Sequence, residues 1–170
     1  MRDFDDNAFP LAYLITFRCY GTWLHGDERG SFRRGNGISY TWAVAPEPNL
    51  LRAETKQLKH PPVTLNGKQR AVVSQALREV CRHREYLLLA VNVRTNHAHT
   101  VVSAVGAPEP ILNTFKAYST RALREAGLIS AGGKPWSRHG STIYLWKERH
   151  VEKAVEYVLL GQGGELPIFD

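Results

Sequence analysis

The sequence predicts an α+β fold: a ferredoxin-like split βαβ with an antiparallel sheet and an added C-terminal helix. Two observations predict it, namely the order of strand and helix patterns and a pair of histidines beside an apolar run. The patterns follow in the order strand, helix, strand, strand, helix, strand, helix, without an internal repeat. At 170 residues the chain is expected to form one domain, residues 1–170, with its core at about 11–164.

The expected strands are short apolar segments bounded by polar or turn residues. Residues 11–20 are apolar almost throughout, which indicates a central strand. Residues 86–93 and 101–105 are two apolar runs joined by the short polar segment 95–100, so they are expected to pair. A shorter strand is expected at 141–146, after a loop that ends in residues 136–140.

Each of the three expected helices has a recognisable start or stop. Asn66 is typical of an N-cap and predicts a helix over about 67–84. Pro108 predicts the start of a second helix, and Gly127 predicts its end. The last helix is expected over about 150–160, where a run of glycines breaks the pattern.

The segment 21–62 shows little periodicity and is predicted to be a long basic loop. Loops of that length in compact domains are usually functional or mobile. Its first half interleaves arginines with Trp23 and Phe32, side chains that could stack on bases. The arginines expected to contact phosphates are Arg29, Arg33 and Arg34. The alternative is a surface loop that covers one edge of the sheet.

Charge and cysteine content narrow the class of protein. Twenty-two Lys and Arg against sixteen Asp and Glu give a formal net charge of +6, which fits a polyanionic partner without requiring one. Cys19 and Cys81 are too few for a disulfide framework, which favours a reducing cytoplasm. No signal peptide and no apolar run near the ~18 residues of a membrane span are visible, so we expect a cytoplasmic protein without a membrane partner.

The pair His97 and His99 is the strongest chemical signal in the chain. Alternate residues of a strand share one face, so the two imidazoles are expected to point the same way, roughly 7 Å apart at Cα. Two imidazoles on a rigid strand supply half of a divalent-metal site. The alternative is that one or both are hydrogen-bonded interior or edge histidines.

Two tyrosines of the predicted helices differ in where they point. Tyr157 lies roughly 130° from the centre of the apolar stripe of its helix, whereas Tyr118 lies only about 75° from the stripe of its own. Tyr118 is therefore predicted to pack against the core. Tyr157 is held off the core face, either for chemistry or as an ordinary exposed tyrosine.

The ordered set of motifs resembles the single-tyrosine HUH transposases of bacterial insertion sequences, and most closely their relatives, the REP-associated tyrosine transposases. Besides His97-Ala98-His99 and Tyr157, five stretches carry this resemblance. They are residues 12–17 (AYLITF), 20–24 (YGTWL), 93–97 (VRTNH), 136–141 (WSRHGS) and 157–163 (YVLLGQG). They occur in the right order between about residues 11 and 164.

The resemblance implies an enzyme that cleaves and rejoins single-stranded DNA through a 5′-phosphotyrosine. His97 and His99 would hold Mg²⁺ or Mn²⁺, and Tyr157 would be the nucleophile. In the best-known family arrangement a glutamine follows the tyrosine by four residues. Here that place is Gly161, and Gln162 follows by five, so Gln162 is the expected third ligand only if it leaves the helix.

The expected partner is single-stranded DNA, as hairpin or repeat ends, with a homodimer and a bacterial, nucleoid-associated location also implied. Further residues expected to carry the DNA backbone are Lys116, Arg121, Arg138 and Lys147. A phenol with a pKa near 10 needs its anion stabilised, and histidine ligands must be neutral, so activity is expected to fall as pH drops through ~6.5.

Three other functions fit part of the pattern. A domesticated transposase could be a non-catalytic binding module, because ferredoxin-like sheets with basic loops also bind single-stranded nucleic acid. Such a module should show aromatic residues on its central strands. A two-histidine phosphoesterase repeats an H-x-S/T signature, which occurs once, at 139–141. A general metal hydrolase needs a further His or carboxylate near the pair.

Overall fold

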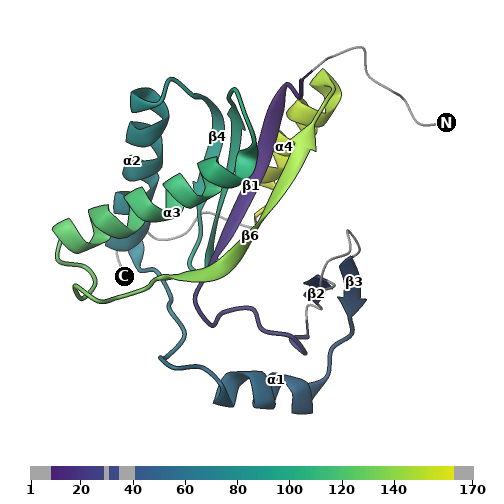
Figure 1. Cartoon of the computed structure of the whole chain (residues 1–170), viewed down its shortest axis with the longest axis vertical. Helices are drawn as coiled ribbons and strands as arrows, with labels where there is room; N and C mark the ends of the chain where they lie inside the picture. Colours follow the sequence, from purple (N-terminus) through teal and green to yellow (C-terminus); the bar gives the residue numbers. More distant parts are fainter. Residues whose placement is uncertain (1–8, 29–30, 35–40, 163–170) are drawn as a thin grey trace.

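The computed structural model describes residues 9–28, 31–34 and 41–162, with the backbone alone at 31–34 and 41–43 (Figure 1). No helix in this part of the chain is long and apolar enough to cross a membrane.

A four-stranded antiparallel sheet forms the centre of the molecule, with strand order β4-β5-β1-β6. Its strands are β1 (Ala12–Cys19), β4 (Leu87–Val93), β5 (His97–Ser103) and β6 (Trp136–Leu145). The predicted ferredoxin-like order is confirmed, because the first and third strands are the two inner ones. β1 pairs on both sides, as its nearly continuous apolar sequence predicts.

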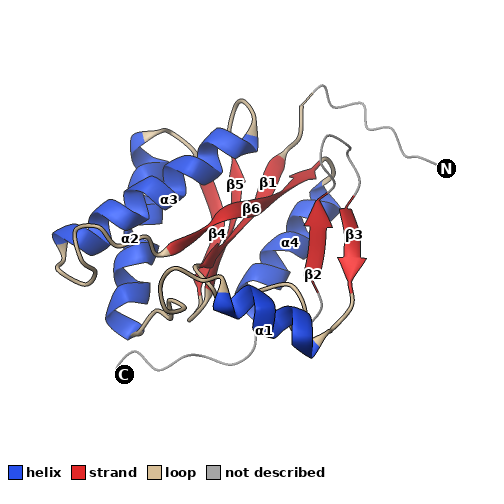
Figure 2. Ribbon diagram, turned by 60° about the horizontal axis from the view of Figure 1, so that its bottom comes forward, coloured by secondary structure: helices blue, strands red, loops and turns tan. Residues whose placement is uncertain are grey.

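Helices cover both faces of this sheet (Figure 2). α2 (Gly67–His83) and α3 (Pro108–Glu125) pack on one face, and α4 (Glu148–Leu160) packs on the other. The alternation along β1 separates the two cores: Ile15 and Phe17 lie under α2 and α3, whereas Ala12 and Leu14 lie under α4.

The helix boundaries follow from local hydrogen bonds. Asn66 forms a capping box with Gln69: each side chain accepts a hydrogen bond of 2.9 Å from the other's backbone N–H. α3 begins at Pro108, and Gly127 follows its end with φ +67°, a left-handed conformation that glycine adopts without strain. These three predicted boundaries are confirmed, and α4 begins two residues earlier than expected.

The prediction of a long structureless loop at 21–62 is wrong. This segment contains the hairpin of β2 (Ser31–Arg34) and β3 (Thr41–Val44) and the helix α1 (Pro48–Lys56). Glu47 caps α1 by accepting hydrogen bonds from the backbone N–H groups of Asn49 and Leu50. Little periodic signal is present here because these elements are short: the strands have four residues each and α1 has nine.

The last strand is also longer than predicted. β6 starts at Trp136, which pairs with Cys19 across an irregularity in register, so residues 136–140 belong to the sheet and not to a loop. Gly140 lies opposite Phe17 inside the strand. A glycine in a strand weakens its sequence signature, which explains the missed half of the strand.

Gly140 should be intolerant of any side chain. A Cβ there would lie 2.7 Å from the carbonyl oxygen of Thr16 and 2.8 Å from a methyl carbon of Leu112, so neighbouring backbone must move. We expect Gly140→Ala to lower the free energy of unfolding by about 1–3 kcal/mol in urea titration. Gly132→Ala, where no atom lies within 4 Å, is the control and should change stability by less than about 0.5 kcal/mol.

Candidate active site

His97 and His99 lie at the start of β5, on the sheet face that α4 covers. Val101, two residues further on the same face, belongs to the core beneath α4. The two imidazole rings are 4.4 Å apart between centroids, at an interplanar angle of 75°. His97 is half-buried, and His99 is only 6% exposed. The strand therefore holds two adjacent rings at the edge of a core, as their spacing predicts.

Both rings are held through Nδ1. Asn96 Oδ1 lies 2.6 Å from His97 Nδ1, and Thr16 Oγ1 lies 2.7 Å from His99 Nδ1. Thr16 is the residue of β1 that pairs with His99 across the sheet. Engaging Nδ1 fixes ring orientation and directs the chemistry to Nε2, which is how histidine ligands are commonly supported.

Gln162 brings an amide to the same place. Its Nε2 donates a hydrogen bond of 3.1 Å to the carbonyl oxygen of Tyr157, so its Oε1 faces His97 Nε2 at 3.2 Å. With Asn96 Oδ1 accepting from Nδ1–H, a neutral His97 carries a lone pair on Nε2. Two acceptors then face each other, and a proton or a cation between them satisfies both.

The donor set fits a divalent cation. Two imidazole nitrogens and one amide oxygen are ligand types that Mn²⁺ accepts, and an amide oxygen also suits Mg²⁺. Among the residues that the structure describes, no group of three or more His, Cys, Asp or Glu converges. Gln162 is therefore the side chain that would supply a third ligand beside His97 and His99.

Tyr157 lies in the last turn of α4, beside the histidines. Its ring centroid is 5.5 Å from that of His99, and the side chain is 46% exposed, while its neighbour Val158 is fully buried. Asn92 Nδ2 donates a hydrogen bond of 2.9 Å to the Val158 carbonyl oxygen, which ties this end of α4 to the sheet. Tyr118 lies on α3, partly buried against the core on the other face of the sheet.

Electrostatics keep His99 neutral. Burial, followed by the charge of His97, lowers the pKa of His99 to about 4; Arg18 lowers it further, and a hydrogen bond with Gln162 opposes the shift. At neutral pH the His99 lone pair is therefore available for a ligand. The His99 ring is therefore expected to lose its ability to bind a metal near pH 4, and not near the pH of ~6.5 expected from the ordinary pKa of histidine.

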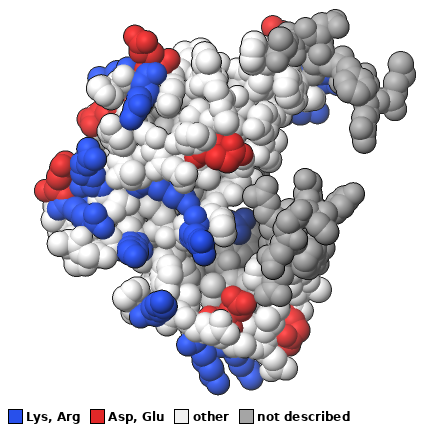
Figure 3. Space-filling model, in the orientation of Figure 1, with Lys and Arg blue, Asp and Glu red and all other residues white. Residues whose placement is uncertain are grey.

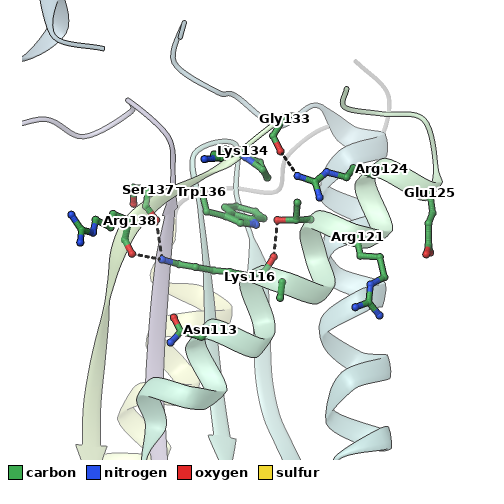
Figure 4. A pocket seen from close by; sticks show the side chains of 13 residues that line it. Asn113, Lys116, Arg121, Arg124, Glu125, Gly133, Lys134, Trp136, Ser137 and Arg138 are labelled. Carbon is green, nitrogen blue, oxygen red and sulfur yellow. Dashed lines mark hydrogen bonds between the residues drawn. The ribbon is translucent and has the colours of Figure 1, made fainter. Parts of the chain in front are cut away.

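Three of the predicted DNA-contacting residues surround a groove of about 600 Å³ between α3 and the start of β6 (Figure 4). The groove lies on the sheet face opposite the histidines, and Figure 3 shows Lys and Arg gathered over this region. Residues 137–139 accept hydrogen bonds of 2.9–3.2 Å from the Nζ of Lys116 through their carbonyls, and burial lowers the pKa of Lys116. Arg121 lies 5.2 Å from the centroid of the Tyr118 ring, and Arg138 lines the groove.

The other predicted contacts are not brought into this groove. Lys147 is the N-cap residue of α4. Arg29 lies outside the described residues, and Arg33 and Arg34 belong to β2, where the structure describes the backbone alone.

Sequence reasoning missed three residues of the site: Thr16, Arg18 and Asn96. Thr16 and Arg18 come from a strand more than seventy residues away, and only the register of β1 against β5 places them beside the histidines. Asn96 directly precedes His97 in the sequence, and this adjacency could have indicated that its side chain supports the ring.

Fold and site together define an α+β protein with paired histidines beside a helix-borne tyrosine. The model of the IS200-like transposase family matches residues 59–158, and the chain belongs to this family. The resemblance seen in the sequence is thereby confirmed at the level of the family.

Two solved structures are similar in shape to this chain. One is a REP-associated tyrosine transposase bound to a REP hairpin, with 10% identity, a TM-score of 0.49, and coverage of 95% of this chain and 72% of that one. The other is a candidate transposase from Deinococcus radiodurans R1, with 13% identity, a TM-score of 0.47, and coverage of 93% and 95%. A search of the curated proteins found no significant match.

The depressed pKa of His99 makes stability depend on pH. The unfolded imidazole binds a proton below ~6.5 and the folded one only near 4, so stability should be lost as pH falls through this interval, by roughly 3 kcal/mol in full. When the pH is lowered from 7 to 4.5, the free energy of unfolding measured in urea should fall by about 2 kcal/mol less for His99→Gln than for the wild type. His83→Gln, which removes an exposed imidazole, is the control. Equal losses in His99→Gln and wild type would contradict the assignment.

Proposed function

We propose that the chain cleaves and rejoins single-stranded DNA through a covalent bond to Tyr157, with Mg²⁺ or Mn²⁺ held by His97, His99 and Gln162. One observation carries the proposal: the tyrosine ring lies 5.5 Å from His99, at the place where Gln162 Oε1 approaches His97 Nε2. A candidate nucleophile and a candidate ligand set thus lie together at the start of β5. The family to which the chain belongs supports transposition as the setting.

The proposed reaction exchanges one phosphodiester for another. The Tyr157 oxygen bonds to phosphorus, the bond from phosphorus to the 3′ oxygen of the leaving strand breaks, and that oxygen gains the proton lost by the phenol. The 5′-phosphate stays on the tyrosine. Rejoining is the reverse: a 3′ hydroxyl attacks phosphorus and Tyr157 leaves as its phenol.

The residues around Tyr157 would supply the remaining requirements. A bound divalent cation would polarise a non-bridging phosphate oxygen and stabilise developing charge. Thr16 and Asn96 hold the two imidazoles with Nε2 directed away from their hydrogen bonds. Tyr157 is 46% exposed, so a DNA strand can approach its ring without opening the core.

DNA hairpins or repeat ends are the proposed substrate form, and a second copy of the chain is a proposed partner. The net charge of +6 and the basic groove on the α3 face support a polyanionic ligand. A module that reads bases on an open sheet face is a poorer fit, because helices pack on both faces of this sheet.

Replacing single tyrosines tests the nucleophile. Tyr157→Phe should abolish a denaturation-resistant protein–DNA adduct while leaving folding nearly intact, because only one hydroxyl is removed. The wild type is incubated with Mn²⁺ and a pool of single-stranded hairpin oligonucleotides, and adducts are scored by denaturing electrophoresis. Tyr118→Phe is the matched control and should retain the adduct. Loss in Tyr118→Phe alone would move the nucleophile, and an adduct in the double variant would end the tyrosine mechanism.

Replacing Thr16 tests the metal site without any DNA. A His99 that ligates through Nε2 carries its proton on Nδ1 and donates it to Thr16 Oγ1, so Thr16→Val should weaken Mn²⁺ binding by about 10- to 100-fold in calorimetric titration. Thr16→Ser keeps the hydroxyl and should bind Mn²⁺ nearly as the wild type does. An unchanged Mn²⁺ affinity in Thr16→Val would argue against His99 as a ligand.

A further inference from the structure

Arg18 lies beside the histidine pair. It is the residue of β1 that pairs directly with His97, and it shares a face with Thr16, which holds His99. Directly opposite residues of an antiparallel pair have Cβ atoms about 5 Å apart, so the Arg18 side chain starts at the rim of the site. Arg18 is partly buried there.

Trp23 holds the Arg18 side chain. The guanidinium carbon of Arg18 lies 3.6 Å from the centroid of the Trp23 ring. The chain returns to this position through a turn at Gly21, whose φ is +72°. Thr22 Oγ1 ties the turn to the end of β1 by donating to the Cys19 carbonyl oxygen at 2.9 Å. Stacking uses the flat face of a guanidinium, whereas its five N–H donors lie in its plane.

The Arg18 guanidinium has the charge and the shape to bind an anion. An arginine guanidinium is protonated throughout the physiological pH range. Register and stacking together place a guanidinium at the rim of the site in which the proposed reaction holds a phosphate. A phosphodiester presents one negative charge, with oxygens that match the guanidinium fork.

We infer that Arg18 binds a non-bridging oxygen of the phosphate that Tyr157 attacks, and that Trp23 positions Arg18 for this contact. The inference rests on the proposed function, because it names the group that receives the phosphate in that same site. Arg18 would then neutralise charge that builds on the phosphate oxygens as the bond to Tyr157 forms. Trp23 would act through Arg18 alone.

Binding to single-stranded DNA tests the contact without cleavage. In a Tyr157→Phe background, Arg18→Gln should weaken binding of a fluorescent oligonucleotide of roughly 20 thymidines by about tenfold. One phosphate contact fewer should lower the slope of log affinity against log salt by about 0.7. Arg78→Gln removes the same charge from an exposed position on α2 and is the matched control. Equal affinities and slopes for Arg18→Gln and Arg78→Gln would overturn the inference.

Two further variants separate charge from position and guard against a folding defect. Arg18→Lys keeps the charge but not the planar fork, so its salt slope should match the parent while part of the affinity is lost. Trp23→Leu should weaken binding with the slope unchanged, because the guanidinium remains. Thermal melting of each variant shows whether it is folded. An unaltered affinity in Trp23→Leu would remove Trp23 from the inference.

Adduct formation on a modified substrate tests whether the contact is to the reacting phosphate. On a normal phosphodiester, Arg18→Gln should slow adduct formation by about tenfold or more. A methylphosphonate at the cleaved position carries no negative charge, so the difference between Arg18→Gln and wild type should shrink to about twofold. An undiminished difference would overturn the assignment to that phosphate.

The two proposals can fail separately. No adduct on any DNA, together with a lower salt slope in Arg18→Gln, would end the proposed cleavage and keep Arg18 as a phosphate contact. Adducts that form at equal rates in Arg18→Gln and Arg78→Gln would end the inference about Arg18 and keep the proposed cleavage.

Discussion

The site depends on the register in which β1 pairs with β5. That pairing sets Thr16 opposite His99 and Arg18 opposite His97, so one strand supplies the rings and the other supplies a hydroxyl and a guanidinium. A slip of one residue would turn each of these side chains to the other face, among the core residues under α2 and α3. The buried alternation of β1, with Ile15 and Phe17 fixed in that core, makes such a slip costly. Core packing on one face of the sheet therefore fixes the positions of the site residues on the other face.

Burial and hydrogen bonding act together on the histidines. An imidazole that is 6% exposed resists protonation, and the same burial requires a partner for its polar atoms, which Thr16 provides at 2.7 Å. His97 is more exposed and faces Gln162 through Nε2. The pair thus combines a ring that is fixed and neutral with a ring whose second nitrogen is engaged by a side chain beyond the end of α4.

Sequence patterns predicted the parts of this arrangement that depend on one element. The period of a strand placed His97 and His99 on one face, and the period of a helix placed Tyr157 off the apolar stripe of α4. The role of Tyr157 and of the two histidines as nucleophile and ligands stays a prediction. Sequence patterns missed the contacts between elements. Thr16 and Arg18 meet the histidines only through strand pairing, which local periodicity does not indicate. The patterns also missed the hairpin and helix between residues 31 and 56, where the two strands have four residues each and the helix has nine.

The end of α4 explains how Gln162, five residues after Tyr157, reaches the histidine pair. At position 161 a Cβ would lie 2.8 Å from the Tyr157 carbonyl oxygen and 3.1 Å from a carbon of the Tyr157 ring. A side chain there would force the helix end or the Tyr157 ring to shift, whereas Gly161 lets the chain leave the helix close over that ring. Gln162 then turns back, donating to the Tyr157 carbonyl oxygen and reaching His97 with Oε1. Gly161 and Gln162 thus act together. Because residue 161 has no side chain, Gln162 can reach His97 while the Tyr157 ring lies beside His99.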